Sequence, residues 1–258
     1  MKAARMWRWI VLGFAGLYVL GPLIGVAEFS LRMRRGTYSF DAYAAVFADE
    51  RFRFSFLYSC ALAVITVIVG VALIVPAAYA VRLHAPRLRG VVEFVTLLPL
   101  VIPAIVIVFG YLRLYGSESL LPLTDSEGGA NVLLACGYVT LALPFIYRAV
   151  DSGLQAIDVR TLSEAAESLG ARKLTVLLRV VLPNIRTALL GAAFLTFAIV
   201  LGEFTIASLL DRPAFGPYLQ LLGANRAYEP AALTLVAFAL TWALMGLIGL
   251  LGGRRGGV

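Results

Sequence analysis

The chain has 258 residues, of which 61% are hydrophobic and 14% are charged, and its mean hydropathy is +0.90. This composition excludes a soluble globular protein and indicates an integral membrane protein. The formal net charge is +7. The basic residues are spread along loops without interleaved aromatics, so the charge gives no reason to expect nucleic-acid binding.

Six apolar stretches are long enough to cross a bilayer as helices, because a hydrocarbon core about 30 Å thick needs roughly 20 apolar residues. They lack the alternation of period two that membrane strands require. The sequence therefore predicts an all-α fold. We expect a single transmembrane domain over residues 1–258, with spans at 9–29, 56–81, 91–112, 131–150, 187–210 and 232–251.

The first stretch follows a basic start, MKAARMWRW, as in a signal peptide. Its apolar run is too long and has no clear small-x-small cleavage site, so we interpret it as a retained first helix. Most Lys and Arg residues lie on one side if both termini are cytoplasmic, which predicts that orientation. The first outer loop is an exception, because it is rich in arginines: Arg32, Arg34, Arg35, Arg51 and Arg53.

Pro99 and Pro103 in the third span each remove a backbone hydrogen bond and predict a kinked or broken helix. Non-helical backbone at membrane depth is tolerated where it is buried or lines a cavity. The two prolines are therefore either absorbed by neighbouring helices or part of a translocation path.

The predicted inner loop between the fourth and fifth spans contains LSEAAESLGARKLTVLLRVVLP, residues 162–183. Thr161 followed by Glu164 fits a capping box at the start of a helix. Gly170 is expected to end that helix in the left-handed conformation, and Pro183 is expected to end a second helix. Apolar residues at helical spacing predict one stripe on each helix: Leu162, Ala165, Ala166 and Leu169, then Leu174, Leu177, Leu178 and Val181.

The small side chains of Ala165 and Ala166 let a helix approach a groove closely, while Glu164 and Glu167 at its edges can pair with basic residues of a partner. A helix this short needs something to dock against. The alternative is a helix lying on lipid headgroups, but an anionic surface favours Lys and Arg over these acids. Docking to a soluble cytoplasmic protein is the preferred interpretation.

The motif residues resemble the EAA motif of the membrane-spanning subunits of binding-protein-dependent ABC importers: Glu164, Ala165, Ala166, Gly170, Val180, Leu182 and Pro183. Every spacing matches, and Val180 stands where Ile is usual. The resemblance runs from about Ser59 to the last span, and includes Gly70, Ala78-Tyr79-Ala80, Pro99 and Pro103. It implies that residues 161–182 are coupling helices seated in a cleft of a separate ATPase, through Glu164, Ala165, Ala166, Glu167, Leu169, Gly170, Leu182 and Pro183.

The same resemblance implies a set of partners in a bacterial cytoplasmic (inner) membrane. An ABC ATPase dimer would bind ATP and Mg²⁺, because this chain has no phosphate-binding loop and no expected cofactor of its own. A second related permease, a solute-binding protein and membrane lipid complete the expected assembly. The pattern is most similar to the spermidine/putrescine type, so a polyamine is the expected cargo. Ferric iron or phosphonate import and a secondary transporter are the alternatives.

No constellation for catalysis or metal binding is apparent, so an enzyme is disfavoured. The single histidine, His84, lies in a loop and is interpreted as a solvated residue. Cys60 and Cys136 lie in apolar spans and are expected to behave as small hydrophobes.

Glu203 is an acid inside the predicted fifth span, where an ionised carboxylate costs at least about 2.5 kcal/mol on insertion scales. One interpretation is a hydrogen-bonded cap that fixes the helix turn at Gly202. The other is that the carboxylate lines the translocation path, where it would favour cationic cargo.

Overall fold

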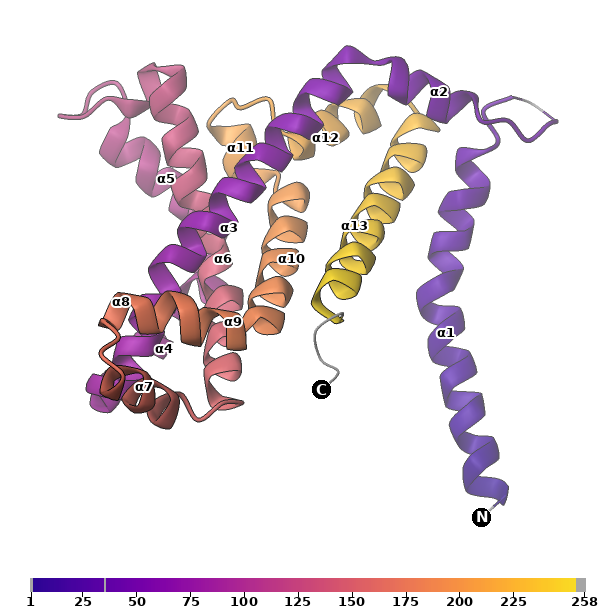
Figure 1. The fold of residues 1–258 in the computed structure, drawn as a ribbon. Coiled ribbons are helices and arrows are strands. Elements are labelled where there is room, and N and C mark those ends of the chain that lie inside the picture. Colours follow the sequence, from indigo (N-terminus) through magenta and orange to yellow (C-terminus); the bar gives the residue numbers. More distant parts are fainter. Residues whose placement is uncertain (1, 35, 254–258) are drawn as a thin grey trace. The chain divides into compact units, whose positions relative to one another are not determined.

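The structure is a computed structural model that describes residues 2–34 and 36–253. All regular structure in these ranges is helical, which confirms the predicted all-α fold (Figure 1). The longer helices are α1 (Lys2–Ser30), α3 (Glu50–His84), α4 (Arg89–Val101), α5 (Ala104–Tyr115), α6 (Glu127–Gln155), α10 (Arg186–Gly202), α12 (Phe215–Asn225) and α13 (Glu229–Gly253). The shorter ones are α2 (Asp41–Ala48), α7 (Val159–Ser168), α8 (Lys173–Val176), α9 (Leu182–Asn184), α11 (Thr205–Leu209), the 3₁₀ turns η1 (Pro86–Leu88) and η2 (Leu123–Asp125), and the π-helical turn η3 (Leu177–Val181).

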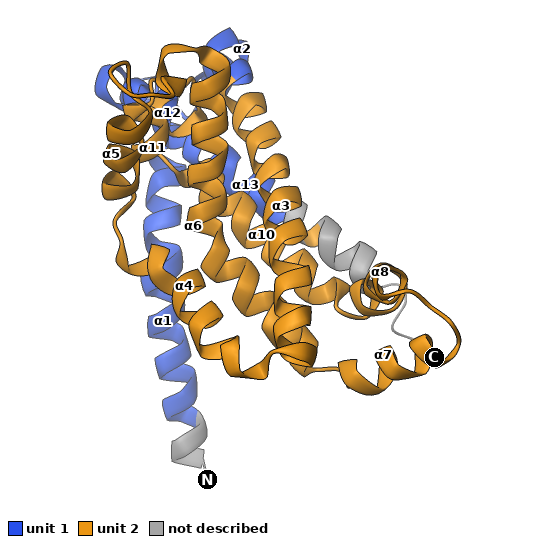
Figure 2. Cartoon of the chain, turned by 90° about the vertical axis from the view of Figure 1, so that its left-hand side faces the viewer, with its two compact units in different colours: residues 1–54, 218–243 blue, residues 55–217, 244–258 orange. Residues whose placement is uncertain are grey.

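The chain folds into two compact units, coloured separately in Figure 2. Unit 1 comprises residues 1–54 and 218–243, and unit 2 comprises residues 55–217 and 244–258. The division falls inside α3, α12 and α13, so none of the three boundaries is a loop. The single transmembrane domain over residues 1–258 stays a prediction.

Unit 1 contains α1, where large apolar side chains from Met6 onward are exposed; Trp7 and Phe14 are examples. We expect a helix with this pattern to be covered by lipid or by another membrane helix. Two contacts join the end of α1 to other parts of unit 1. The hydroxyl groups of Ser30 and Tyr43 lie 2.8 Å apart, and the ring of Phe29 stacks on that of Tyr228 with centroids 4.9 Å apart.

Unit 2 is built around α6, which packs against α4 and α10. Gly153 lets α6 approach α10 closely, because a Cβ atom at this position would lie 2.8 Å from Cβ of Ala188. Gly70 does the same between α3 and Ile146 of α6. The core at one end of the unit also takes in the segment that follows α6, since Val159, Val176 and other apolar side chains of α7 to α9 are buried in it.

By length and composition, three helices can cross a membrane: Met6–Ser30, Glu50–His84 and Glu127–Gln155. The total is up to five if each of two bent pairs is one span, and Glu229–Ala243 is a shorter apolar helix. The first, second and fourth predicted spans lie inside α1, α3 and α6. The count of six spans stays a prediction.

The third predicted span is broken in the structure. Helix α4 ends at Val101, Ile102 is extended, and α5 begins after Pro103 at an angle of 96°. Proline disfavours the helical conformation for the residue before it and offers no N–H, so Pro103 accounts for the break. Pro99 lies inside α4 without ending it.

The fifth predicted span, 187–210, is also not one continuous helix. Helix α10 ends at Gly202, Glu203 is extended, and the short helix α11 begins at Thr205. A second bend, of 78°, separates the segment Lys173–Asn184 from α10. The interruption lies at Glu203, directly after Gly202, where a hydrogen-bonded cap was one interpretation of the sequence.

Candidate functional site

Helix α7 begins earlier than the capping box predicted. Its N-cap is Asp158, whose carboxylate accepts the backbone N–H of Thr161 at 3.2 Å and the hydroxyl of Thr161 at 2.7 Å. Glu164 instead accepts a hydrogen bond from Nε of Arg160 at 2.9 Å. The predicted Thr161–Glu164 box is therefore wrong, because an acid three residues upstream takes the capping position first.

The electrostatics of this first turn follow from those bonds. The hydrogen bonds from the side chain and backbone of Thr161 hold the pKa of Asp158 below its ordinary value. The hydrogen bond and charge of Glu164 raise the pKa of the Arg160 guanidinium. A negative side chain at the start of a helix also suits the helix dipole.

Gly170 ends α7 as predicted, with φ of +84° in the left-handed region. The N–H of Gly170 donates to the carbonyl of Glu167 at 2.9 Å, and the N–H of Ala171 donates to the carbonyl of Ala166 at 3.0 Å. This pair of bonds is a Schellman motif. A Cβ atom at Gly170 would meet no atom of the described residues within 4 Å, so the constraint on this position comes from its backbone conformation.

The second arm of the hairpin departs from the prediction. Helix α8 is followed by the π-helical turn η3 and then by α9, which contains Pro183 in its first turn and ends at Asn184. The wider π turn ends at Val181, and Leu182 continues the helical backbone to Pro183. The helical run continues one residue past Pro183, to Asn184, before the chain bends by 78°.

The two predicted apolar stripes each divide into a buried and an exposed part. Helix α7 packs on unit 2 through Val159, Ser163 and Ala166. Ala165 is exposed on the other side. Leu169 is 90% exposed, and Leu174 and Leu178 of the second arm are 65% and 51% exposed, whereas Leu177 and Val181 are buried.

The hairpin therefore exposes four small and apolar side chains, which we together call the hairpin face: Ala165, Leu169, Leu174 and Leu178. Glu164 and Glu167 are exposed at its edge. Leu182 and Pro183, which the sequence groups with these residues, belong to α9; Leu182 is half-buried and Pro183 is exposed. Figures 1 and 2 show α7 and α8 next to each other at one end of unit 2.

Polar contacts near the hairpin were not anticipated from the sequence. Asp151 at the end of α6 accepts a hydrogen bond from Arg89 at 3.0 Å, and Arg82 of α3 lies 3.6 Å away. Arg148 and Glu93 form a further ion pair between α6 and α4 at 3.4 Å. These charges join the ends of α3, α4 and α6. The arginines were visible in the sequence only as a topology signal.

Glu203 acts as a cap in the structure. Its side chain is buried, and its carboxylate accepts the backbone N–H groups of Ile206 at 2.8 Å and of Ala207 at 3.2 Å. These bonds support the structural interpretation of Glu203. The backbone of Glu203 is also closely packed, because a Cβ atom at Gly216 would clash with the carbonyl oxygen of Glu203. A pathway role for Glu203, Pro99 or Pro103 stays a prediction.

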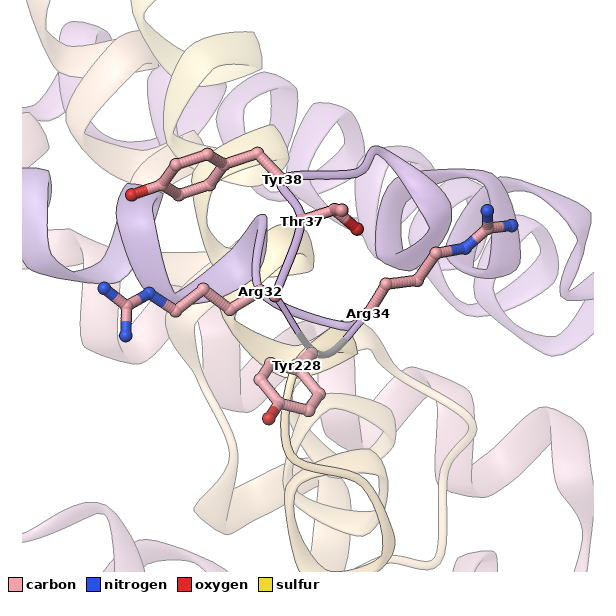
Figure 3. Close-up of a pocket in the computed structure, with 6 residues that line it drawn as sticks. Arg32, Arg34, Thr37, Tyr38 and Tyr228 are labelled. Atoms are coloured by element: carbon pink, nitrogen blue, oxygen red, sulfur yellow. The ribbon is translucent and has the colours of Figure 1, made fainter.

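A cavity of about 420 Å³ in unit 1 is lined by Arg32, Arg34, Gly36, Thr37, Tyr38 and Tyr228 (Figure 3). Its arginines are already partnered, because Arg32 pairs with Glu28 and Arg34 pairs with Asp41. In the part of the chain that the structure describes, no group of three or more His, Cys, Asp or Glu side chains is placed to hold a metal ion.

Comparison with known proteins gives a clear family assignment. Residues 70–254 match the family described as "Binding-protein-dependent transport system inner membrane component". A probable molybdenum ABC transporter permease protein of Haloferax volcanii is 32% identical over 203 residues, which cover 77% of this chain and 72% of that protein. The spermidine/putrescine transport system permease protein PotC of Haemophilus influenzae is 28% identical over 203 residues, 77% of this chain and 75% of that protein.

Among solved structures, the chain is similar in fold to a chain of a bacterial alginate ABC transporter in complex with an alginate pentasaccharide-bound periplasmic protein. The TM-score is 0.74 at 14% identity, with 100% of this chain and 98% of that chain covered. At this identity the likeness establishes the fold alone.

Proposed function

Because the chain belongs to the family of inner-membrane components of binding-protein-dependent transport systems, we propose that it is the permease subunit of an ABC importer and that the hairpin face is its docking site for a separate ATPase. Members of this family are transport subunits and not enzymes. The chain is accordingly a multi-pass membrane protein of the transport machinery.

The hairpin face is the observation that carries the docking site. It combines a small residue, Ala165, with the exposed leucines Leu169 and Leu174, and acids flank it. A partner that covers these exposed apolar side chains removes their surface from water, which lowers the free energy of the complex. The Schellman turn at Gly170 fixes the angle between the two arms, so a partner meets both as one surface.

The proposed assembly contains two ATPase subunits, which bind ATP and Mg²⁺, a second related permease and a solute-binding protein. We place the hairpin and both termini on the cytoplasmic side of the inner membrane, from the distribution of Lys and Arg. The alginate transporter that shares this fold was solved with a periplasmic protein, which supports the binding-protein partner.

The proposed mechanism couples ATP to the position of α7. Closure of the ATPase dimer displaces the hairpin, and because Val159 and Val176 are buried in the core of unit 2, the displacement moves the membrane helices with it. The rearranged helices open the pathway toward the binding protein, and hydrolysis of ATP resets it. The chain supplies the moving surface, and the partner supplies the energy.

The experiment is transport and ATP hydrolysis by the assembled complex carrying Gly170→Asp. A side chain at φ of +84° is strained, and the added carboxylate projects into the open space where the partner docks. We expect a complex that is inserted and folded but that loses uptake. Normal uptake by this variant would contradict the proposal that the ATPase docks at the hairpin.

The expected cargo is a polyamine, in line with the likeness to a spermidine/putrescine permease. Molybdenum is a second candidate, favoured by the Haloferax volcanii relative at 32% identity. Since the carboxylate of Glu203 is already bonded to two backbone N–H groups, it gives little reason to prefer a cation. Uptake of radiolabelled spermidine and of molybdate by cells with and without this chain separates the two.

A further inference from the structure

A buried chain of hydroxyl groups links the hairpin to a membrane helix. The hydroxyl of Tyr79, near the end of α3, donates to Oγ of Ser163 in α7 at 3.0 Å. Oγ of Ser163 in turn donates to the carbonyl of Val159 at 2.6 Å. The Tyr79 side chain is 6% exposed and that of Ser163 is 3% exposed, so water does not compete for these bonds.

This bond differs from the other side-chain hydrogen bonds of α7. Those join residues within a turn of each other: Arg160 with Glu164, Thr161 with Asp158, and Ser168 with Glu164. Among the described residues, Tyr79 is the partner of α7 in a side-chain hydrogen bond to another helix. The remaining contacts of α7 with the core are apolar packing by residues such as Val159 and Ala166.

Apolar contacts and a buried hydrogen bond respond differently to a displacement. Apolar packing is non-directional, so a helix can slide over a neighbour while most of the buried area is kept. A hydrogen bond needs a defined distance and angle, and breaking it would leave the buried hydroxyl of Tyr79 without a partner. The bond therefore holds α7 and the end of α3 at a fixed mutual position.

We propose that Tyr79 is a positioning residue that makes the end of α3 move together with α7, so that displacement of the hairpin reaches this membrane helix. The inference rests on the proposed function, because it takes the hairpin to be displaced by an ATPase. Tyr79 touches neither ATP nor cargo and acts through Ser163.

The sequence of α3 provides a point at which the end of this helix can move. Pro76 lies inside α3, one turn before Tyr79, and it cannot donate a backbone hydrogen bond to Ala72. A helix bends most readily where such a bond is missing. The part of α3 that precedes Pro76 is held against α6 at Gly70, where a Cβ atom would clash with Ile146. Arg82 joins the segment after Pro76 to Asp151 near the end of α6, so a displacement of α7 that passes through Tyr79 acts on the ends of both helices.

The test is the amount of solute transported per ATP hydrolysed by the complete importer in proteoliposomes, with Tyr79→Phe. The variant keeps the ring and removes the bond, while Ser163 retains its own bond to Val159. We expect ATP hydrolysis to continue and transport per ATP to fall about 2- to 10-fold, the factor that corresponds to one net hydrogen bond.

Tyr138→Phe is the matched control. Tyr138 is also buried in unit 2, but its hydroxyl has no hydrogen-bond partner among the residues that the structure describes. This variant removes the same group from the same kind of environment without touching α7, so we expect the wild-type ratio of transport to ATP hydrolysis.

Ser163→Ala and the double variant complete a cycle. If the hydrogen bond between Tyr79 and Ser163 transmits the displacement, Ser163→Ala lowers the ratio of transport to ATP hydrolysis. Adding Tyr79→Phe in the double variant then lowers this ratio little further. An unchanged ratio in Tyr79→Phe, with the ATPase still bound, overturns this inference and leaves the proposed function intact. A wild-type chain that recovers no ATPase overturns both.

Discussion

At the scale of single residues, three helix ends in this chain depend on identifiable groups. Asp158 caps the start of α7, Gly170 closes its end, and Glu203 caps α11. Each satisfies backbone groups that a helix end leaves without partners. The helices concerned are short, so their ends make up much of their structure.

The cap at Glu203 predicts a difference between two substitutions. Glu203→Ala leaves the buried N–H groups of Ile206 and Ala207 without acceptors, and each such group costs about 1–3 kcal/mol. Glu203→Gln keeps one oxygen acceptor. Thermal unfolding of the purified chain in detergent is expected to show a clearly lower midpoint for Glu203→Ala than for Glu203→Gln. Equal midpoints for both variants would mean that the carboxylate is not a cap.

The cap at Asp158 predicts a pH dependence of α7. Because the folded-state pKa lies below the ordinary value of 3.8, ionised Asp158 stabilises α7 at pH above that value. The stabilisation is lost as the pH falls through the lowered folded-state pKa. Hydrogen exchange of the first-turn amides, corrected for its intrinsic pH dependence, is expected to speed up there in the wild type.

Asp158→Asn is the control for this titration, because asparagine also caps helices but does not ionise. Its amide protection is expected to be flat over the same pH range. A wild-type profile as flat as that of the variant would contradict the assignment of the cap.

How far the sequence could predict these caps differs between the three. Gly170 was predictable, since glycine after the last apolar residue of a periodic helix is a strong signal. Asp158 was not, because Thr161 with Glu164 also fits a start signal and only the geometry distinguishes the two. Glu203 was left with two interpretations, since a lone acid in an apolar run needs hydrogen-bond partners but the sequence does not identify those partners.

At the scale of elements, the packing of α6 on α10 depends on one close approach. A Cβ atom at Gly153 would lie 2.8 Å from that of Ala188 and 3.2 Å from that of Ile185. At Gly191, in the interior of α10, a Cβ atom would meet no atom of the described residues within 4 Å beyond the local backbone of the helix. The same substitution at these two glycines should therefore have opposite effects.

Gly153→Ala is expected to destabilise the chain by about 1–3 kcal/mol, because the helices must separate to admit a methyl group. Gly191→Ala is expected to stabilise it by about 0.5–1 kcal/mol through the lower flexibility of the unfolded chain. Unfolding midpoints of the two purified variants provide the measurement. Destabilisation of the same size in both would contradict this packing.

The elements themselves were only partly visible in the sequence. The break between α4 and α5 follows from Pro103, since proline restricts both itself and Ile102. The π turn at Leu177–Val181 has no local signal in the sequence, and Leu177 within it is buried while Leu178 is exposed. Periodicity assumes an unbroken α-helix and cannot show such a shift.

At the scale of the whole molecule, composition and one motif determine the class of protein. Apolar composition indicates a membrane protein, and the fixed spacing from Glu164 to Pro183 resembles the permease motif, in agreement with the family match over residues 70–254. Composition and the motif do not identify the cargo. Relatives named for molybdenum and for spermidine and putrescine are similar to this chain at comparable identity.

The central claim is that the hairpin face binds an ATPase, and copurification tests it most directly. The tagged chain is isolated in mild detergent from its native membrane as the wild type, as Ala165→Glu and as Ala165→Ser. We predict that a P-loop ATPase copurifies with the wild type and with Ala165→Ser, which keeps a small side chain. Ala165→Glu should lose it, because a bulky charge then lies within the face. Equal recovery of the ATPase with all three chains, or with none of them, would contradict the account.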